Sequence, residues 1–159
     1  MEPESELNPR DVGAVLSAWG LTVTVLDDDA STAPLAAQAL GTSVMAIAKS
    51  IVFMAGDEAI LVVAAGDRKV STSAIQRVVE GRVRLAKPEQ VLRVTGFRVG
   101  GVPPVAHRQP LRTLLDERLR ALSTVYAAAG GSHSIVALTP AQLGDLTRGV
   151  WLQVSEPTE

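Results

Sequence analysis

Two neighbouring apolar runs give the clearest pattern along the chain. Residues 49–55 and 59–65 are nearly continuously apolar and contain several β-branched side chains, which is typical of buried strands. Only Gly56, Asp57 and Glu58 separate the two runs. We therefore expect a β-hairpin with a short turn.

Helix and strand signals alternate over the rest of the chain. Asn8 followed by Pro9 is a typical N-cap with its first helical residue, and Gly20 is a typical stop. Periodicity and turn residues predict helices at 9–19, 32–40, 71–79, 88–94 and 140–146, and strands at 21–26, 82–85, 111–115, 124–129, 134–138 and 150–154. Because some strands join through a hairpin and others through helices, we expect a mixed α/β (α+β) fold with helices around a mixed sheet.

Length and composition fit one domain with a single hydrophobic core. We expect this domain to span residues 1–159, with residues 1–30 as an N-terminal helix and strand extension. Aromatic residues make up only 3% of the chain, which disfavours an extended aromatic platform for RNA. The acidic N-terminus has no signal-peptide pattern, and no apolar run approaches the ~18 residues of a membrane span. We therefore expect a cytoplasmic protein with no membrane contact.

Charge is distributed unevenly around a net value of −2, which argues against broad attraction to nucleic acid and against a DNA partner. Residues 1–30 contain seven acidic residues and one basic residue, whereas residues 67–98 contain eight basic and three acidic residues. This basic stretch fits contact with a few phosphates, such as those of a single-stranded tRNA end. Arg82 and Arg84 are the candidate RNA-binding residues. A solvated helix face is the alternative explanation.

Several kinds of catalytic site are disfavoured. The chain has no cysteine, no G-x-S-x-G motif and only two histidines, which lack metal-ligand spacing such as H-x-x-x-H. Asp27, Asp28 and Asp29 are consecutive, so they cannot all face one cation on a strand, and a charged turn is the better interpretation. We expect neither a bound metal nor a cofactor.

A stiff loop is predicted where two glycines and two prolines fall within five positions, at Gly100, Gly101, Pro103 and Pro104. Glycine allows positive φ and close backbone approach, while proline fixes φ and removes a donor. Val102 precedes a proline and is expected to be extended. Such a loop can direct backbone N–H groups at a ligand oxygen, or it can simply be a rigid turn.

Lys49 is the only charged residue between Asp29 and Asp57, and it begins an apolar strand. Lysine is seldom fully buried unless it is paired. Its ammonium either reaches water along the end of the strand or is directed into a pocket that receives an anion or a polarised carbonyl.

These features together resemble the YbaK/prolyl-tRNA-synthetase-associated editing domain family. The resemblance rests on Lys49, on the G-x-x-x-P loop from Gly100 to Pro104, and on Gly131-Ser132-His133. It extends over residues 31–154. It includes, in this order, LAAQALG at 35–41, AKS at 48–50, LVVAAGDR at 61–68, LAKPEQV at 85–91 and TGF at 95–97. The order and spacing of these segments make the resemblance more specific than any one of them.

The resemblance implies a fold and an activity. The fold would be a strongly curved mixed β-sheet or incomplete barrel with flanking helices. The activity would be that of a free-standing trans-editing deacylase, which hydrolyses the ester of mischarged tRNA at the acceptor end. Alanine on tRNA-Pro is favoured as substrate, with cysteine, serine and threonine left open, and a cognate synthetase is a candidate partner. The alternative is a catalytically silent module of the same fold that binds a tRNA 3′ end, a nucleotide or a synthetase.

The resemblance also implies catalytic roles. Lys49 matches the functional lysine of the family, which we interpret as holding the ester end of the substrate by its charge. Backbone N–H groups around Gly100 and Gly101 are expected to stabilise the developing oxyanion. Either a bound water or the neighbouring hydroxyl of the terminal adenosine would be the attacking or assisting group, and the sequence leaves both open.

Substrate-binding roles follow for the rest of the loop and for both histidines. Val102, Pro103 and Pro104 are expected to bind substrate. His133 matches a histidine that lines the amino-acid pocket in the insertion domain of prolyl-tRNA synthetase, although a structural role at a strand start is equally open. His107 either hydrogen-bonds the loop or faces solvent. Many relatives carry a histidine after the first strand, and here Asp27 stands near that position. Any part of substrate selection that depends on this part of the pocket therefore stays open.

Overall fold

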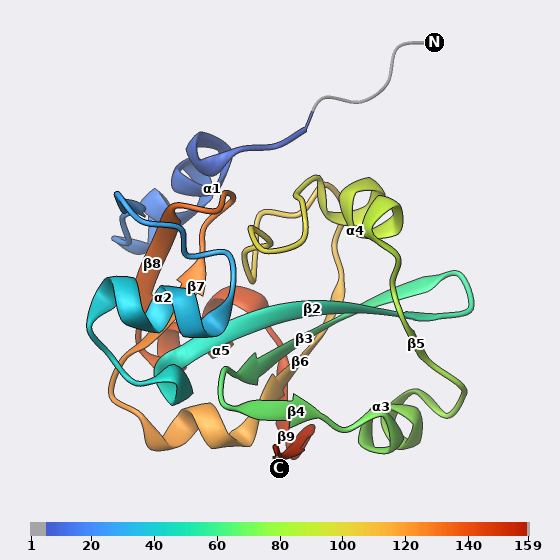
Figure 1. Ribbon diagram of the computed structural model, residues 1–159. Helices are drawn as coiled ribbons and strands as arrows, with labels where there is room; N and C mark the ends of the chain where they lie inside the picture. The colour runs from blue at the N-terminus through green and yellow to red at the C-terminus, as the bar shows by residue number, and fades with distance from the viewer. Residues whose placement is uncertain (1–5, 159) are drawn as a thin grey trace, which may run out of the picture.

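The computed structural model describes residues 6–158, in which helices and strands follow the predicted order (Figure 1). The α-helices are α1 (Pro9–Leu16), α2 (Ala33–Leu40), α3 (Thr72–Val79), α4 (Pro88–Thr95) and α5 (Pro140–Thr147). The strands are β1 (Thr24–Val25), β2 (Ile47–Ala55), β3 (Glu58–Ala65), β4 (Arg68–Val70), β5 (Arg84–Leu85), β6 (Arg112–Asp116), β7 (Val125–Ala128), β8 (Ser134–Leu138), β9 (Val150–Leu152) and β10 (Ser155–Pro157). None of the helices in the described part of the chain combines the length and apolar character needed to cross a bilayer.

The N-terminal helix forms because its first turn is capped from both directions. The Asn8 side chain accepts hydrogen bonds from the N–H groups of Arg10 and Asp11, and the Asp11 carboxylate accepts one from the Asn8 N–H. The predicted helix at 9–19 is confirmed, but it is α-helical only as far as Leu16. Its last turn, Ser17–Trp19, is a 3₁₀ helix that ends at Gly20 in the left-handed conformation.

One mixed sheet contains eight of the strands. Its order is β1-β8-β7-β2-β3-β6-β9, with β5 paired to part of β2. The β2–β7, β3–β6 and β6–β9 pairs are parallel, and the other pairs are antiparallel. The predicted mixed sheet with flanking helices is therefore confirmed. The sheet is not closed, because its end strands β1 and β9 are not paired with each other.

Some predicted boundaries were wrong. The strand expected at 21–26 is reduced to β1, because the Leu21 N–H bonds back to Leu16 at the end of the first helix. The strand expected at 82–85 is reduced to β5, and β2 begins two residues earlier than predicted. The short strands β4 and β10 were missed, since three residues are too few for a periodic pattern; they pair with each other in a separate sheet.

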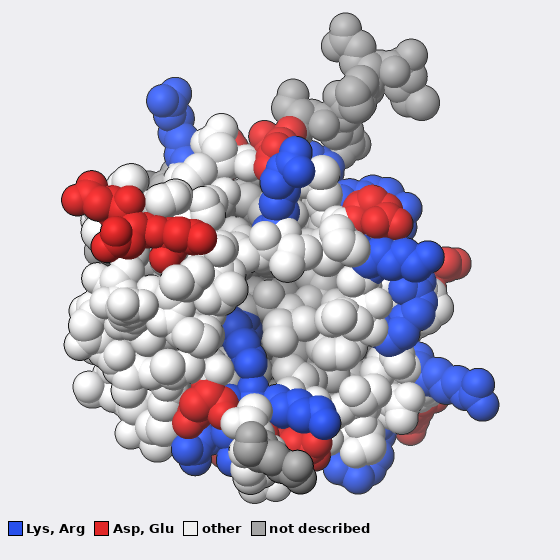
Figure 2. Space-filling view, in the orientation of Figure 1, with Lys and Arg blue, Asp and Glu red and all other residues white. Residues whose placement is uncertain are grey.

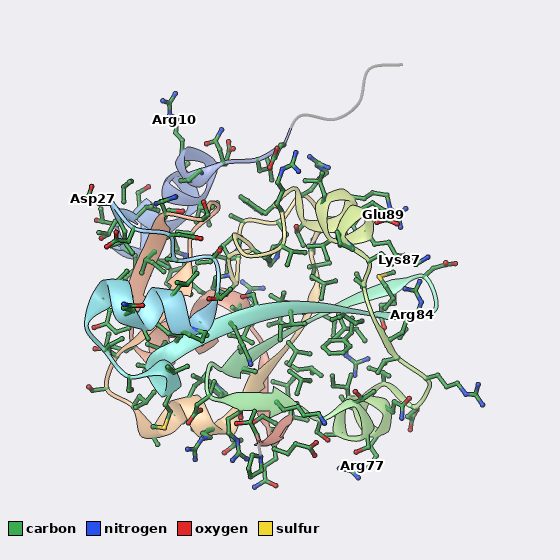
Figure 3. All side chains as sticks on the ribbon, in the orientation of Figure 1. Arg10, Asp27, Arg77, Arg84, Lys87 and Glu89 are labelled. Atoms are coloured by element: carbon green, nitrogen blue, oxygen red, sulfur yellow. The ribbon has the colours of Figure 1, made fainter. Side chains whose placement is uncertain are left out.

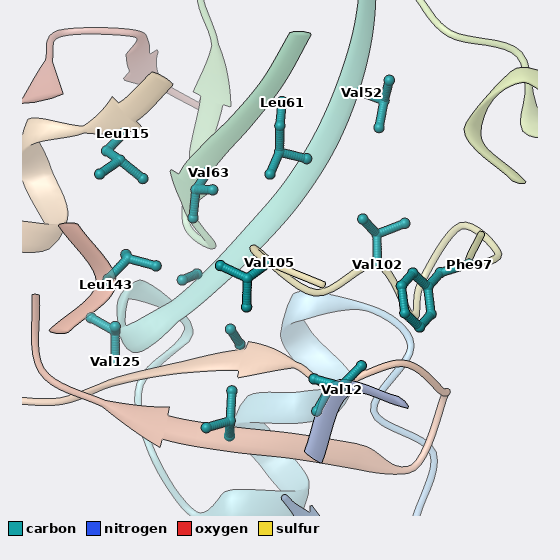
Figure 4. Close-up of a cluster of buried hydrophobic side chains, with 14 of the residues drawn as sticks. Val12, Val52, Leu61, Val63, Phe97, Val102, Val105, Leu115, Val125 and Leu143 are labelled. Atoms are coloured by element: carbon teal, nitrogen blue, oxygen red, sulfur yellow. The ribbon is translucent and has the colours of Figure 1, made fainter. Parts of the chain in front are cut away.

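The central hairpin buries both of its faces. Val52, Leu61 and Val63 belong to the larger core cluster on one face, while Phe53 and Val62 belong to a second cluster on the other face. Figure 4 shows part of the larger cluster, which also includes Val102 and Val105 from the loop after α4. The loop is therefore attached to the core by its two valines.

The second edge of β2 is paired only at its two ends. Its first edge pairs with β3 over residues 48–55. On the other edge, β7 pairs with Ile47 and Ala48, and β5 pairs with Phe53 and Met54. Ala86, just after β5, adds a hydrogen bond to the Val52 carbonyl oxygen at 3.0 Å. The sheet thus has a gap along the middle of β2.

Two glycine turns meet next to this gap. The Gly130 N–H donates to the Gly101 carbonyl oxygen at 2.9 Å. A Cβ atom on Gly101 would lie 3.1 Å from both the N and the Cα of Gly131. Gly100 has a φ of 92°, and a Cβ there would lie 3.0 Å from the Ser31 carbonyl oxygen. Glycine is therefore required for the backbone segments to pack this closely.

We predict that Gly101→Ala lowers the free energy of unfolding by about 1–3 kcal/mol, as overpacked sites do. Thermal and denaturant unfolding measure this loss. Gly81→Ala is the matched control, because a Cβ at Gly81 has no heavy atom within 4 Å. Equal stability of the two variants would contradict the backbone contact.

Candidate functional site

A cavity of about 200 Å³ opens at the gap along β2. Its walls include Lys49 and Ser50 from β2, Ser31 and Ala36 around the start of α2, and Gly100 and Val102 from the loop after α4. Figure 2 shows the corresponding face of the molecule hollowed near its centre. The hollow brings together segments as far apart in sequence as Ala30 and Ile135, so only the folded chain creates it.

Lys49 lies in the wall of this cavity with its ammonium fixed. The side chain is part-buried, and Nζ donates a hydrogen bond of 2.6 Å to the carbonyl oxygen of Arg68 at the start of β4. Burial lowers the pKa of Lys49 below its ordinary value, whereas the negative charges of Asp67 and Asp116 act to raise it. The side chain therefore lies in the cavity wall and is hydrogen-bonded to the backbone, and its role toward an anion or a polarised carbonyl stays a prediction.

The two carboxylates near Lys49 were not singled out from the sequence. Asp116 ends β6 with 1% of its surface exposed, and its oxygens accept hydrogen bonds from the N–H groups of Ala65 and Arg118. Asp67 forms an ion pair with Arg118 at 3.5 Å. Asp116 could have been noticed in the sequence as an acidic residue at the end of an apolar strand.

The two glycines of the loop play different parts. Gly100 lines the cavity, and within residues 6–158 its N–H donates to no other group. Gly101 is buried behind it, and its N–H already donates to the carbonyl oxygen of Arg98 at 2.9 Å. Of the two expected oxyanion donors, Gly100 is therefore the one with an available N–H.

Of the remaining loop residues, one lines the cavity and the others lie behind the lining or contact the loop. Val102 lines the cavity, while Pro103 and Pro104 are buried and lie outside its described lining. The His107 ring places Nε2 2.7 Å from the Pro103 carbonyl oxygen. Burial lowers the pKa of His107, and the hydrogen bond to Pro103 partly opposes that shift. Of the two expectations for His107, the structure favours the hydrogen bond to the loop.

His133 is not among the residues that line the cavity. Its side chain is exposed, and its carbonyl oxygen accepts a hydrogen bond of 2.6 Å from Leu26. Hydrogen bonds from Ser31 lower the pKa of the nearby Asp29, with a smaller contribution from the charge of His133. Asp27 is exposed in the same charged turn. In residues 6–158, no cluster of three or more histidine and acidic side chains could hold a metal ion.

The predicted RNA-binding arginines lie away from the cavity. Arg82 and Arg84 are exposed, and Arg84 donates from Nη1 to Oε1 of Gln90 at 2.9 Å. Figure 3 places Arg84 and Lys87 at one side of the molecule and Asp27 at the opposite side. In Figure 2, acidic groups gather on that opposite side and basic groups on the side of Arg84. The hollow lies between the acidic side and the basic side.

Comparisons with known proteins agree with the predicted family and fold. The family model of the aminoacyl-tRNA editing domain matches residues 27–146. The uncharacterized protein YwhH of Bacillus subtilis (strain 168) is 34% identical over 139 residues, which are 86% of this chain and 88% of YwhH. A crystal structure described as that of a candidate trans-editing enzyme for prolyl tRNA synthetase has a TM-score of 0.88 and 38% identity, covering 93% of this chain and 96% of that chain.

Similarity also extends to part of a much larger enzyme. The proline–tRNA ligase of Leuconostoc citreum (strain KM20) is 33% identical over 109 residues. The match covers 62% of this chain and only 19% of the ligase. The chain thus spans about a fifth of the ligase and most of YwhH.

We predict that the Lys49 pKa, followed by NMR through its side-chain carbon shifts, lies below 10.5 because burial penalises the ammonium. Asp67→Asn should lower this pKa further, since the carboxylate favours the charged form. Asp57→Asn is the control and should leave it unchanged, because Asp57 lies exposed in the β2–β3 turn. A midpoint at or above 10.5 would show that burial is not the dominant effect.

Proposed function

The chain belongs to the aminoacyl-tRNA editing domain family, and on this premise we propose that it is a free-standing trans-editing deacylase. Its substrate would be a tRNA that carries the wrong, small amino acid, with tRNA-Pro as the favoured carrier. The similarity to proline–tRNA ligase and to the candidate trans-editing enzyme supports that choice of tRNA. A cognate synthetase is the corresponding protein partner.

The observation that carries the proposal is a fixed ammonium and an unpaired backbone N–H in one small cavity. Lys49 supplies the ammonium and Gly100 supplies the N–H. An aminoacyl ester is already labile, so an enzyme mainly has to orient water and stabilise the developing oxyanion. These groups suffice for such chemistry without a nucleophilic side chain.

Lys49 acts in this proposal as a point charge. An ammonium has three N–H donors, and one of them is used by the Arg68 carbonyl oxygen. The other two are available to the ester oxygens of a substrate. The bond to Arg68 stabilises the position of Nζ, so the charge is already in place when the substrate binds.

The walls of the cavity favour a small aminoacyl side chain. Much of the lining consists of alanines, among them Ala30, Ala36, Ala48 and Ala128, and the enclosed volume is about 200 Å³. Alanine is the favoured amino acid, but one methylene changes selectivity by only ~1–3 kcal/mol, so serine, threonine and cysteine belong in the same test.

We predict that Lys49→Ala lowers the rate of deacylation by about 100-fold or more, the usual cost of losing a group that stabilises an oxyanion. The assay follows loss of labelled amino acid from a panel of mischarged tRNAs with catalytic amounts of protein. Lys69→Ala is the matched control, because Lys69 is exposed on the neighbouring strand β4. Unfolding curves would establish that both variants keep the fold.

Two outcomes of this assay would contradict the proposal. Equal rates for Lys49→Ala and the parent protein would remove the lysine from the mechanism. Decay of every ester at the buffer rate, together with binding of the tRNA, would favour a catalytically silent module.

A second prediction concerns the basic surface. Charge reversal at Arg82 and Arg84 should raise the KM for charged tRNA and leave kcat unchanged, because both arginines lie outside the cavity lining. The slope of log KM against log salt should fall by about 0.7 for each lost single-strand phosphate contact.

The matched control for the basic surface is Arg10→Glu. Arg10 is also exposed and lies on another side of the molecule from Arg84 (Figure 3). If the double reversal and the control change KM equally, the tRNA approaches from elsewhere.

A further inference from the structure

The register of β2 leaves one peptide unit without a partner in the sheet. Ala55 pairs with Glu58 at the hairpin turn, so the odd-numbered residues of β2 exchange hydrogen bonds with β3. The even-numbered residues direct their N–H and C=O groups to the other edge. At that edge Ala48 pairs with β7, and the Val52 carbonyl oxygen accepts a hydrogen bond from the Ala86 N–H.

Ser50 lies between these two pairs and faces the gap. The pairing with β7 ends at Ala48 and that with β5 begins at Phe53, so within residues 6–158 neither the N–H nor the carbonyl oxygen of Ser50 has a ladder partner on this edge. Its side-chain Oγ is buried and also has no partner there. Ser50 lines the cavity, so a donor, an acceptor and a hydroxyl are available together in its wall.

Buried polar groups without partners are uncommon, because each one costs the energy of its lost hydration. A ligand that pairs with all three groups would remove this cost. In an antiparallel pair, two facing residues exchange both of their backbone hydrogen bonds. A suitable ligand therefore has a donor and a carbonyl oxygen on one amino-acid unit, as a residue in a strand has.

We infer, resting on the proposed deacylase function, that Ser50 binds the aminoacyl group of the substrate as a one-residue strand. The carbonyl oxygen and Oγ of Ser50 accept hydrogen bonds from the α-ammonium. The Ser50 N–H donates to the ester carbonyl oxygen. This arrangement selects a free α-amine on the carbon next to the ester carbonyl. It does not depend on the amino-acid side chain, whose size is limited by the alanine-lined walls.

The same contacts assist hydrolysis. Water attacks the ester carbon and forms a C–O bond, while the carbonyl oxygen gains negative charge that the Ser50 N–H stabilises. The bond to the ribose oxygen then breaks, and a proton that the attacking water releases is taken up by that oxygen. The products are the free amino acid and the tRNA hydroxyl. Ser50 thus complements Gly100 and Lys49 at the reacting carbonyl.

The test uses an amide-linked alanyl-adenosine, which is not hydrolysed, and its N-acetylated form. Binding to the full chain is followed by ¹H–¹⁵N NMR. We expect the Ser50 amide signal to shift with the alanyl compound, and N-acetylation to weaken binding about ten-fold or more, since a hydrogen-bonded charge is lost. Ser50→Ala should weaken binding of the alanyl compound and have little effect on that of the acetylated one. Ser43→Ala is the control, because Ser43 is exposed just before β2.

Three results would overturn the inference: equal binding of the two compounds, an unshifted Ser50 amide in a saturated complex, or no binding of the alanyl compound. Turnover tests the proposed function separately. If alanyl-tRNA and N-acetylalanyl-tRNA are hydrolysed at equal rates, the deacylase function stands and the role of Ser50 is wrong. If the alanyl compound binds with the expected Ser50 shift but no tRNA is hydrolysed, recognition at Ser50 stands and the deacylase function is wrong.

Discussion

The unpaired middle of β2 is the constraint on which the candidate site depends. Two strands share one edge of β2, with β7 parallel to its start and β5 antiparallel to its end. Neither extends to the middle, so a cavity opens there instead of a continuous sheet. Because the opposite edge pairs with β3 over eight residues, β2 stays extended although this stretch lacks a second neighbour. The rigidity of the hairpin therefore supports an opening in the sheet.

Close backbone packing holds the other wall of the cavity in place. The contact of Gly101 with Gly130 and Gly131 fixes the loop after α4 against the turn between β7 and β8. Val102 and Val105 attach the same loop to the core. The His107 ring adds a hydrogen bond to the Pro103 carbonyl oxygen. Gly100 therefore lies in the cavity lining on a backbone that these contacts hold in place. On the β2 side, Lys49 is held in a comparable way by the Arg68 carbonyl oxygen.

Local patterns in the sequence were enough for most of the elements. Apolar runs with β-branched residues identified the central hairpin, and the Asn8-Pro9 start with Gly20 identified the first helix, because these signals act over a few neighbouring residues. The family resemblance, now confirmed, rested on the order of short motifs. Lys49 and Gly100 could be singled out as candidate site residues because a charge in an apolar run, and two glycines followed closely by two prolines, are unusual locally.

Tertiary structure decided which backbone groups are available, because hydrogen-bond pairing joins residues that are distant in sequence. The Gly101 carbonyl oxygen accepts a hydrogen bond from Gly130, and the Ser50 peptide unit faces a gap because of the register of β2. Asp67 acts on Lys49 because β2 pairs with β3, and Asp116 does so because β6 pairs with β3 in turn. The three-residue strands β4 and β10 form because they pair with each other. Sequence thus determined the elements and the charged residue at the site, whereas long-range pairing determined which polar groups remain open to a substrate.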